Sequence, residues 1–336
     1  MRKTLFVLLI AVSFITACKK SNKPNPSTAA KKIIVSTVGG LGDPEGLTID
    51  VSGNLYVANG LIDNIGKITS AGAISIFAGK ISTNGTSSCD YENGIGNAAA
   101  FCNPVGIAAD GLGNLYVADA GNGVIRKISS GAAVTTYALS GVGIGEPYGI
   151  AIDRSDNIYI TDPYNSLIYK VSPNGIASIF AGSGVAGNNN GLGTASSFNR
   201  PLGLTIDAVG NIYVADQANN VIRKITPAGM VSTFAGTGTA GNTNGNVTAA
   251  SFDSPSGIAI DAAGNIYVAD SGNDLIRKIS TSGMVSTYAG NGSEGTTNGV
   301  GEIATFSYPT AVVVDKDGNL YIGEANSGLI RKIVVQ

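Results

Sequence analysis

One phrase recurs six times along the chain, and this repetition limits the fold more than any other feature. Each copy has Pro at its second position, Gly-Asn or Asp-Asn at its eleventh and twelfth, and an acid or Asn at its end. The copies occupy residues 43–59, 103–119, 146–162, 200–216, 254–270 and 308–324. The last three intervals between their prolines are equal, whereas the first is longer and the second shorter, so similar units are joined by connections of variable length.

Every unit contains four short runs that are rich in β-branched residues and Tyr, without helical periodicity. In the unit that begins at residue 200, these runs lie at 203–207, 211–216, 221–225 and 230–236. Four short strands per unit predict one blade of a β-propeller, with the first run, which is small and apolar, nearest the axis. The Gly-Asn and Asp-Asn pairs tolerate positive φ and predict a tight hairpin between the first two strands.

The two ends of the chain supply parts of one blade. The last unit has only three runs, whereas residues 34–40 (IVSTVGG) match the fourth run at 230–236 (MVSTFAG). We therefore expect the N-terminal strand to complete the last blade, which closes the ring and removes exposed sheet edges. The predicted fold class is all-β: a six-bladed β-propeller of four-stranded antiparallel blades over residues 33–336.

The recurring motifs resemble the NHL repeat family. Pro-x-Gly-Ile/Leu-x-x-Asp, Gly-Asn-Ile/Leu-Tyr-Val-Ala-Asp and Val/Leu-Ile-Arg-Lys-Ile recur in this order over essentially the whole of the predicted propeller. The resemblance implies a six-bladed propeller but no single activity, because the family includes enzymes, sensor domains and interaction platforms. WD40 and kelch repeats agree less well, since the chain has neither Trp nor His and has Gly-Gly only at residues 39–40.

Residues 1–32 are expected to direct export rather than join the fold. Arg2 and Lys3 precede an apolar run at 5–17, which is too short to span a bilayer comfortably and is typical of a signal peptide. The run ends in Ile-Thr-Ala-Cys18, which resembles the bacterial lipobox; a plain cleavable signal is the alternative. We predict a lipoprotein signal peptide at 1–18, lipidation at Cys18, and a flexible tether at 19–32 rich in Lys, Pro and Ser.

Charge is distributed unevenly between these parts. Seven of the 21 Lys and Arg lie within residues 1–32, which contain no acid, so the remainder holds 14 basic and 23 acidic groups, a formal charge of −9. Such a surface repels phosphate backbones, so we expect no nucleic-acid partner. The Lys-rich tether and its anchor would suit an anionic membrane; a solvated spacer is the alternative. The expected location is the bacterial cell envelope, at the outer membrane facing the periplasm or the surface, with the chain as a monomer.

The chain contains no His, which excludes a Ser-His-Asp or Cys-His mechanism and any imidazole ligand to a metal. No catalytic residue is therefore predicted.

Five of the six second runs end in an acid, and an Arg follows seven residues later in four of these five. The acids and the Asn at the same position are Asp119, Asp162, Asp216, Asp270, Glu324 and Asn59. The residues seven positions later are Arg126, Tyr169, Arg223, Arg277, Arg331 and Gly66. Because the first unit has lost both partners, we predict structural acid–Arg pairs; a ring of carboxylates around Ca²⁺ is the alternative. Asp162 faces Tyr169 instead of an Arg, so it is the carboxylate expected to be free for a ligand.

Four of the five connections between units are long and built alike, at 80–102, 183–199, 237–253 and 291–307. Each carries a Phe three residues before the next Pro: Phe101, Phe198, Phe252 and Phe306. We expect this Phe to fill the cleft between blades, although loops of this length are also often functional. The longest connection contains Cys89 and Cys102, and with Cys18 lipidated we predict a disulfide between them; two free thiols are the alternative.

The residues that flank each blade Pro vary while their surroundings repeat. In propellers the blade connections and the hairpins after the second strand share one face, so these residues should surround the axial mouth. The predicted ligand-binding residues there are Glu45, Glu146, Tyr148, Arg200 and Tyr308, together with Asp162. Unconstrained loop variation would give a similar pattern.

These features favour a binding protein over an enzyme: a lipid-anchored envelope propeller that presents this face to a protein or glycan ligand. No cofactor is predicted, with Ca²⁺ at the mouth as the alternative. A metal-dependent hydrolase or lyase of the lactonase kind, with oxygen ligands at the axial mouth, is the competing hypothesis, and a purely structural envelope component is a third.

Overall fold

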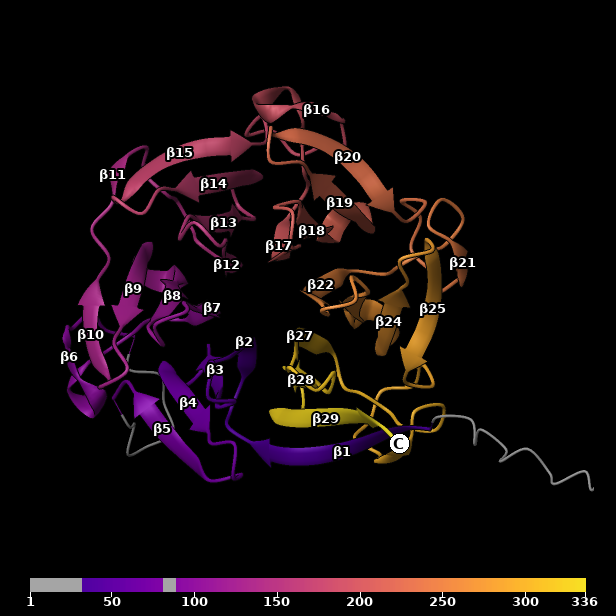
Figure 1. Ribbon diagram of the computed structural model, residues 1–336, viewed down its shortest axis with the longest axis horizontal. Coiled ribbons are helices and arrows are strands. Elements are labelled where there is room, and N and C mark those ends of the chain that lie inside the picture. Colours follow the sequence, from indigo (N-terminus) through magenta and orange to yellow (C-terminus); the bar gives the residue numbers. More distant parts are fainter. Residues whose placement is uncertain (1–31, 81–88) are drawn as a thin grey trace, which may run out of the picture. The chain divides into compact units, whose positions relative to one another are not determined.

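Six small sheets surround a central axis in the computed structural model, which describes residues 32–80 and 89–336 (Figure 1). The sheets form a six-bladed β-propeller, as the repeats predict. The predicted signal peptide, Cys18 and all of the predicted tether except Lys32 lie outside the described residues. In the described part of the chain, no helix is long and apolar enough to cross a membrane.

The strands of each blade are ordered from the axis outward, as Figure 1 shows. The innermost strands are β2 (Pro44–Ile49), β7 (Pro104–Ala109), β12 (Ile150–Ile152), β17 (Pro201–Ile206), β22 (Pro255–Ile260) and β27 (Pro309–Val314). The second strands are β3 (Leu55–Asn59), β8 (Leu115–Asp119), β13 (Ile158–Asp162), β18 (Ile212–Asp216), β23 (Ile266–Asp270) and β28 (Leu320–Glu324). The third strands are β4 (Asn64–Ile68), β9 (Val124–Ile128), β14 (Leu167–Val171), β19 (Val221–Ile225), β24 (Leu275–Ile279) and β29 (Leu329–Val335). The fourth strands are β5 (Ile74–Ala78), β10 (Ala133–Thr136), β15 (Ile176–Ala181), β20 (Met230–Ala235), β25 (Met284–Ala289) and β1 (Ile33–Gly40). We number the blades 1 to 6 in the order of their innermost strands.

The N-terminal strand completes blade 6, which confirms the predicted closure of the ring. β1 pairs antiparallel with β29 from Ile33 opposite Val335 to Gly40 opposite Leu329. In Figure 1 the indigo β1 therefore lies beside the yellow β29.

Five of the six blades contain a short fifth strand that the sequence did not predict. These strands are β6 (Gly94–Ile95), β11 (Ser140–Gly141), β16 (Gly191–Leu192), β21 (Gly245–Asn246) and β26 (Gly299–Val300). β11 runs parallel to β15, whereas the other four run antiparallel to their neighbours and come from the four long connections. Each long connection thus covers part of the outer edge of the blade that follows it, which protects that edge from pairing with another chain.

Short 3₁₀ turns account for the remaining regular structure of the described residues. They are η1 (Gly96–Ala98), η2 (Ala120–Asn122), η3 (Gly193–Ala195), η4 (Gln217–Asn219) and η5 (Ser271–Asn273).

Glycine allows the innermost strands to approach one another closely. A Cβ atom on Gly46 would overlap the carbonyl oxygen of Val105 in blade 2, and one on Gly106 would overlap that of Tyr148 in blade 3. In blade 6 the corresponding residue is Ala311, and its partner on β28 is Gly323, whereas the other second strands carry Ala or Thr there. The larger residue on the innermost strand of blade 6 is thus offset by a smaller one on its second strand.

A repeated Asp stabilises the hairpin between the first and second strands through hydrogen bonds. Asp207 Oδ1 accepts hydrogen bonds from the backbone N–H groups of Val209 and Asn211 at 3.0 and 2.8 Å, and Oδ2 accepts one from Asn211 Nδ2 at 2.7 Å. Partial burial favours protonation, but these bonds outweigh it and lower the pKa of Asp207. The equivalent residues with the same three bonds are Asp50, Asp110, Asp153, Asp261 and Asp315.

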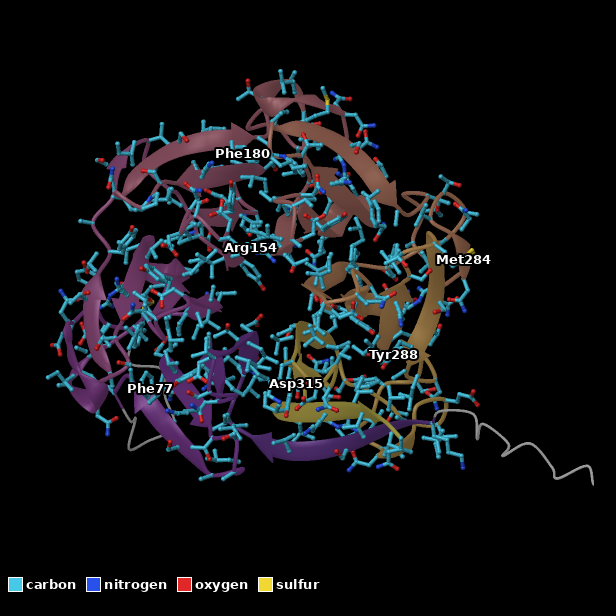
Figure 2. The ribbon with its side chains drawn as sticks, in the orientation of Figure 1. Phe77, Arg154, Phe180, Met284, Tyr288 and Asp315 are labelled. Carbon is cyan, nitrogen blue, oxygen red and sulfur yellow. A yellow bond between two sulfur atoms is a disulfide. The ribbon has the colours of Figure 1, made fainter. Side chains whose placement is uncertain are left out.

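Apolar side chains from adjacent blades form the core. One cluster combines Tyr159 and Ile168 of blade 3 with Leu204 and Val214 of blade 4, and similar clusters fill the other blade interfaces. Farther from the axis in blades 1 to 5, an aromatic ring on or just after the fourth strand packs edge to face against a Tyr of the second strand. Figure 2 shows three of these outer rings, which belong to Phe77, Phe180 and Tyr288.

Candidate functional site

The ring contains two kinds of blade. Blades 2, 4, 5 and 6 are each preceded by a long connection, and we call them loop-carrying blades. Blades 1 and 3 are preceded only by short segments, and we call them loopless blades. The difference determines what surrounds the residue at the end of the second strand: an Arg and a loop in the loop-carrying blades, and short polar segments in the loopless ones.

In a loop-carrying blade, a buried Arg attaches the preceding connection to the blade. Arg223 Nη1 donates to Asp216 Oδ2 and to the carbonyl oxygen of Ser197, each at 2.9 Å. Its Nη2 donates to the carbonyl oxygen of Asn189 and to Asn190 Oδ1, each at 3.0 Å. Both Asp216 and Arg223 are fully buried, so the guanidinium finds its acceptors only because the loop and the acid meet there.

The same set of contacts recurs in all four loop-carrying blades. The other pairs are Asp119–Arg126 at 2.9 Å, Asp270–Arg277 at 2.8 Å and Glu324–Arg331 at 2.7 Å. Each Arg also donates to two loop carbonyls and one loop Asn. These pairs thus anchor loops, whereas the sequence suggested that they join strands or blades.

The predicted Phe residues complete this anchor. Phe198 is fully buried, and the Arg223 guanidinium carbon lies 5.2 Å from the centre of its ring. The equivalent Phe–Arg distances are 5.1 Å for Phe101, 5.4 Å for Phe252 and 5.3 Å for Phe306. The four carboxylates of these blades are therefore enclosed by protein.

Asp162 was expected to be free for a ligand, and the structure contradicts this. The side chain is fully buried. Its Oδ1 accepts from Asn165 N at 2.9 Å, and its Oδ2 accepts from Asn165 Nδ2 at 2.8 Å and from Glu146 N at 3.3 Å. The Tyr169 hydroxyl lies 3.5 Å from Oδ2. Blade 3 lacks the Arg and the long loop, and the Asp162 carboxylate instead accepts hydrogen bonds from the short segments around it. In blade 1, Asn59 takes this position and donates to Asn64 Oδ1.

A disulfide joins Cys89 to Cys102 in the connection before blade 2. Asp63 holds both ends of this segment, because its carboxylate accepts from Cys89 N at 2.8 Å and from Asn103 N at 2.7 Å. The cross-link therefore lies between the loopless blade 1 and the axial end of blade 2.

The axial mouth is the opening at the Pro end of the innermost strands. A cavity of about 80 Å³ lies there and is lined by Glu45, Val105, Tyr148, Ser256 and Thr310, each of which directly follows a blade Pro. The Tyr148 hydroxyl donates to Glu45 Oε2 at 3.1 Å, so a side chain of blade 1 meets one of blade 3 over blade 2. Both side chains are partly exposed.

The ionisable side chains at the mouth have raised pKa values. Burial and the neighbouring Asp43 raise the pKa of Glu45 to about 7, although the hydrogen bond from Tyr148 opposes the rise. Burial also raises the pKa of Asp43, against a hydrogen bond from Leu61 N. Burial and the Glu45 charge raise the pKa of Tyr148 well above its ordinary value. Glu45 can therefore exchange a proton near neutral pH while Tyr148 stays protonated.

The residue before each Pro differs between the two kinds of blade. In the loop-carrying blades it has positive φ: Asn103 at 51°, Arg200 at 56°, Ser254 at 52° and Tyr308 at 50°. This conformation is unfavourable for a non-Gly residue, and more so before Pro. Of the predicted residues, Arg200 and Tyr308 are exposed, and both influence the pKa of Tyr148 electrostatically, so both lie near the mouth. Glu146 is partly exposed beside the buried Asp162. The four residues with positive φ have different side chains, so the sequence did not predict this conformation.

The described residues contain no cluster of metal-binding side chains. Among residues 32–80 and 89–336, no group of three or more His, Cys, Asp or Glu side chains is placed to hold a metal ion.

Known proteins agree with this architecture. The NHL repeat model matches residues 101–128 and 252–279. A segment covering 28% of the chain is 42% identical to the Arabidopsis thaliana protein SUPPRESSOR OF QUENCHING 1, chloroplastic, and one covering 34% is 37% identical to the Bos taurus NHL repeat-containing protein 2. The chain spans only 9% and 16% of the lengths of these two relatives.

Solved structures match nearly the whole described ring. A protein of unknown function from Bacteroides thetaiotaomicron has a TM-score of 0.73 at 21% identity, with 91% of this chain and 76% of that chain covered. An auxiliary nutrient binding protein from Bacteroides ovatus has a TM-score of 0.67 at 16% identity, covering 91% and 77%. A streptogramin B lyase has a TM-score of 0.59 at 18% identity, covering 91% and 98%. At such identities the likeness shows the fold alone. The chain is thus a six-bladed β-propeller, two segments of which match the NHL repeat model.

Proposed function

We propose that the protein is a lipid-anchored binding module of the bacterial cell envelope that holds a protein or glycan ligand at its axial mouth. The observation that carries the proposal is the Glu45–Tyr148 pair, two hydrogen-bonded side chains from different blades that border a cavity. Around them the repeated carboxylates are buried in structural contacts. Polar side chains that depart from a repeated pattern and border a cavity are typical of a binding site. The propeller fold shared with nutrient binding proteins of Bacteroides is consistent with binding.

A binding assay with envelope extract tests the site. The immobilised mature chain is compared with the double variant Glu45→Gln/Tyr148→Phe, which removes the charge and the shared hydrogen bond with little change of size. We expect at least a fivefold loss of captured material. Glu302→Gln, on an exposed segment of the connection before blade 6, is the matched control and should bind like the wild type. Prior protease or periodate treatment of the extract distinguishes a protein ligand from a glycan. Equal capture by the double variant would contradict a site at the mouth.

The anchor is tested separately. Metabolic labelling with a palmitate analogue should modify the wild-type protein and leave Cys18→Ala unlabelled. The labelled protein should partition into the detergent phase of Triton X-114. An unlabelled wild-type protein, or a labelled Cys18→Ala variant, would contradict lipidation at this residue.

A further inference from the structure

The loopless blades leave two large apolar side chains exposed on the face of the mouth. Leu61 and Tyr164, which lie two positions after the end of β3 and β13, are 70% and 83% exposed. In the loop-carrying blades, the same position holds a small residue: Gly121, Ala218, Gly272 or Asn326. The reason is steric, since a Cβ on Gly121 would overlap Cys102 Sγ and one on Gly272 would lie 2.6 Å from Asp253 Cγ. Loop packing thus leaves no room for a larger side chain at Gly121 and Gly272, whereas blades 1 and 3 lack the loops that impose this constraint.

Acidic groups lie beside Leu61. Leu61 N donates to the Asp43 carboxylate, so Leu61 is directly adjacent to the acidic side of the mouth. A Cβ on Gly60 would lie 2.8 Å from Asn103 Oδ1, 3.1 Å from Glu45 Cγ and 3.3 Å from Asp43 Oδ2. The chain therefore brings three oxygen-bearing side chains around one glycine.

These acids form no ion pair within the described part of the chain, although the Arg200 cation acts on the neighbouring Tyr148. None of the ion pairs at 4.0 Å or less involves Asp43, Glu45 or Glu146. The repulsion between Asp43 and Glu45 is one reason that Glu45 holds its proton to near neutral pH. A cation placed between the two carboxylates would remove this repulsion and allow both to ionise.

We propose that the surface formed by Glu45, Leu61, Glu146, Tyr148 and Tyr164, with the buried Asp43 beneath it, binds a cationic polypeptide segment. A Lys or Arg side chain of the segment is held by Glu45 beside the negative charge of Asp43, and flanking apolar side chains pack on Leu61 and Tyr164. Charge complementarity and exposed anchor side chains beside a polar centre are the features that favour such a partner. A neutral glycan would require no surplus of negative charge and would gain little from the aliphatic Leu61. The inference rests on the proposed function, because it names the ligand class of the same mouth.

Selection from a random dodecapeptide display library tests the inference. On the wild-type mature chain, we expect enrichment of peptides that combine Lys or Arg with aliphatic or aromatic residues. The double variant Glu45→Gln/Leu61→Ala should not enrich them. Enrichment of uncharged or acidic peptides on the wild type, lost in the double variant, would overturn the cationic assignment while leaving a binding mouth intact. No enrichment over the double variant, together with equal capture of envelope material by the mouth variants, would overturn both proposals.

Titration of one selected peptide gives the quantitative test. Acetylation of its Lys side chains, or citrulline in place of Arg, should weaken binding at least tenfold. Glu45→Gln should also weaken it at least tenfold and Leu61→Ala at least fivefold. The matched controls are Glu302→Gln and Leu112→Ala, because Leu112 is 86% exposed in a hairpin at the opposite end of the strands. Both controls should stay within twofold of the wild type. Equal affinity for the neutralised peptide would show that the site does not recognise charge.

Discussion

Loop-carrying and loopless blades share one backbone frame but use their charged residues differently. In blade 4 the carboxylate of Asp216 is enclosed by Arg223 and the preceding loop, whereas in blade 3 Asp162 is served by Asn165 and a backbone N–H. Two positions after the second strand, the loop-carrying blades hold Gly, Ala or Asn, whereas the loopless blades expose Leu61 and Tyr164. The comparison teaches that the loops on this face are structural, and that the Glu45–Tyr148 pair comes from the two blades that lack them.

The largest expected effect is the loss of a loop anchor. Arg223→Met leaves Asp216 buried without its cation and frees two loop carbonyls, which should lower the free energy of unfolding by about 3–5 kcal/mol. Tyr169→Phe, at the same position in loopless blade 3, should cost less than about 1 kcal/mol. Urea unfolding of both variants measures the difference. Equal losses would erase the distinction between the two kinds of blade.

Transplanting the Arg into a loopless blade sharpens the comparison. Tyr169→Arg places a guanidinium beside Asp162 in a buried site that lacks the long loop and its carbonyl acceptors. We expect destabilisation of about 2–3 kcal/mol, because the donors that face the missing loop stay unsatisfied. Thermal and urea unfolding would reveal it. A stabilised variant would mean that the acid–Arg pair is sufficient without a loop.

Glu45 should make the stability of the protein depend on pH. Its folded pKa is about 7, above the ordinary value of 4.5, so the folded state binds the proton more tightly and stability falls as pH rises between these values. The groups that act on this site are Asp43 and Tyr148, with Arg200 and Tyr308 acting on Tyr148.

Glu45→Gln should remove this part of the pH dependence. Relative to the wild type, the variant should gain about 2 kcal/mol between pH 5 and pH 8. Urea midpoints across this range measure the gain, with Glu302→Gln as the control. A pH-independent difference between wild type and Glu45→Gln would show that burial of Glu45 is not costly.

The smallest effect concerns the backbone before the blade Pro. Ser254→Gly should stabilise the protein by about 0.5–1 kcal/mol, because Gly accepts φ of 52° without the steric cost. Glu146 is not among the described residues with positive φ, so Glu146→Gly in blade 3 should destabilise by a similar amount. Differential scanning calorimetry resolves shifts of this size. The same sign in both variants would contradict a backbone difference between the blades.

The ring, its closure by β1 and the number of blades could be predicted because they follow from the repeats and from the matching ends of the chain. The acid–Arg pairs were also visible, through their constant spacing across a hairpin. Their loop acceptors were not, because backbone carbonyls have no sequence signature. The co-occurrence of each Arg with a long preceding loop was nevertheless present in the sequence and could have indicated the anchor.

Errors arose where the fold supplied partners that the prediction did not consider. Asp162 was expected to be free because its Arg is missing, but Asn165 is part of an Asp-x-x-Asn pattern that also occurs in three loop-carrying blades. The five short outer strands were missed because they contain no run long enough to show periodicity. The exposure of Leu61 and Tyr164 could not be read from the sequence either, since it depends on the absence of a covering loop.

The pairing of β1 with β29 has a consequence for biosynthesis. β1 is among the first parts of the propeller to be made, yet its partner is the last strand of the chain. During translation, this strand stays without its native neighbour until β29 has been made, so the ring can close only after Val335 is available. Premature termination near the C-terminus would therefore leave two unmatched strand edges in blade 6, one at each end of the polypeptide.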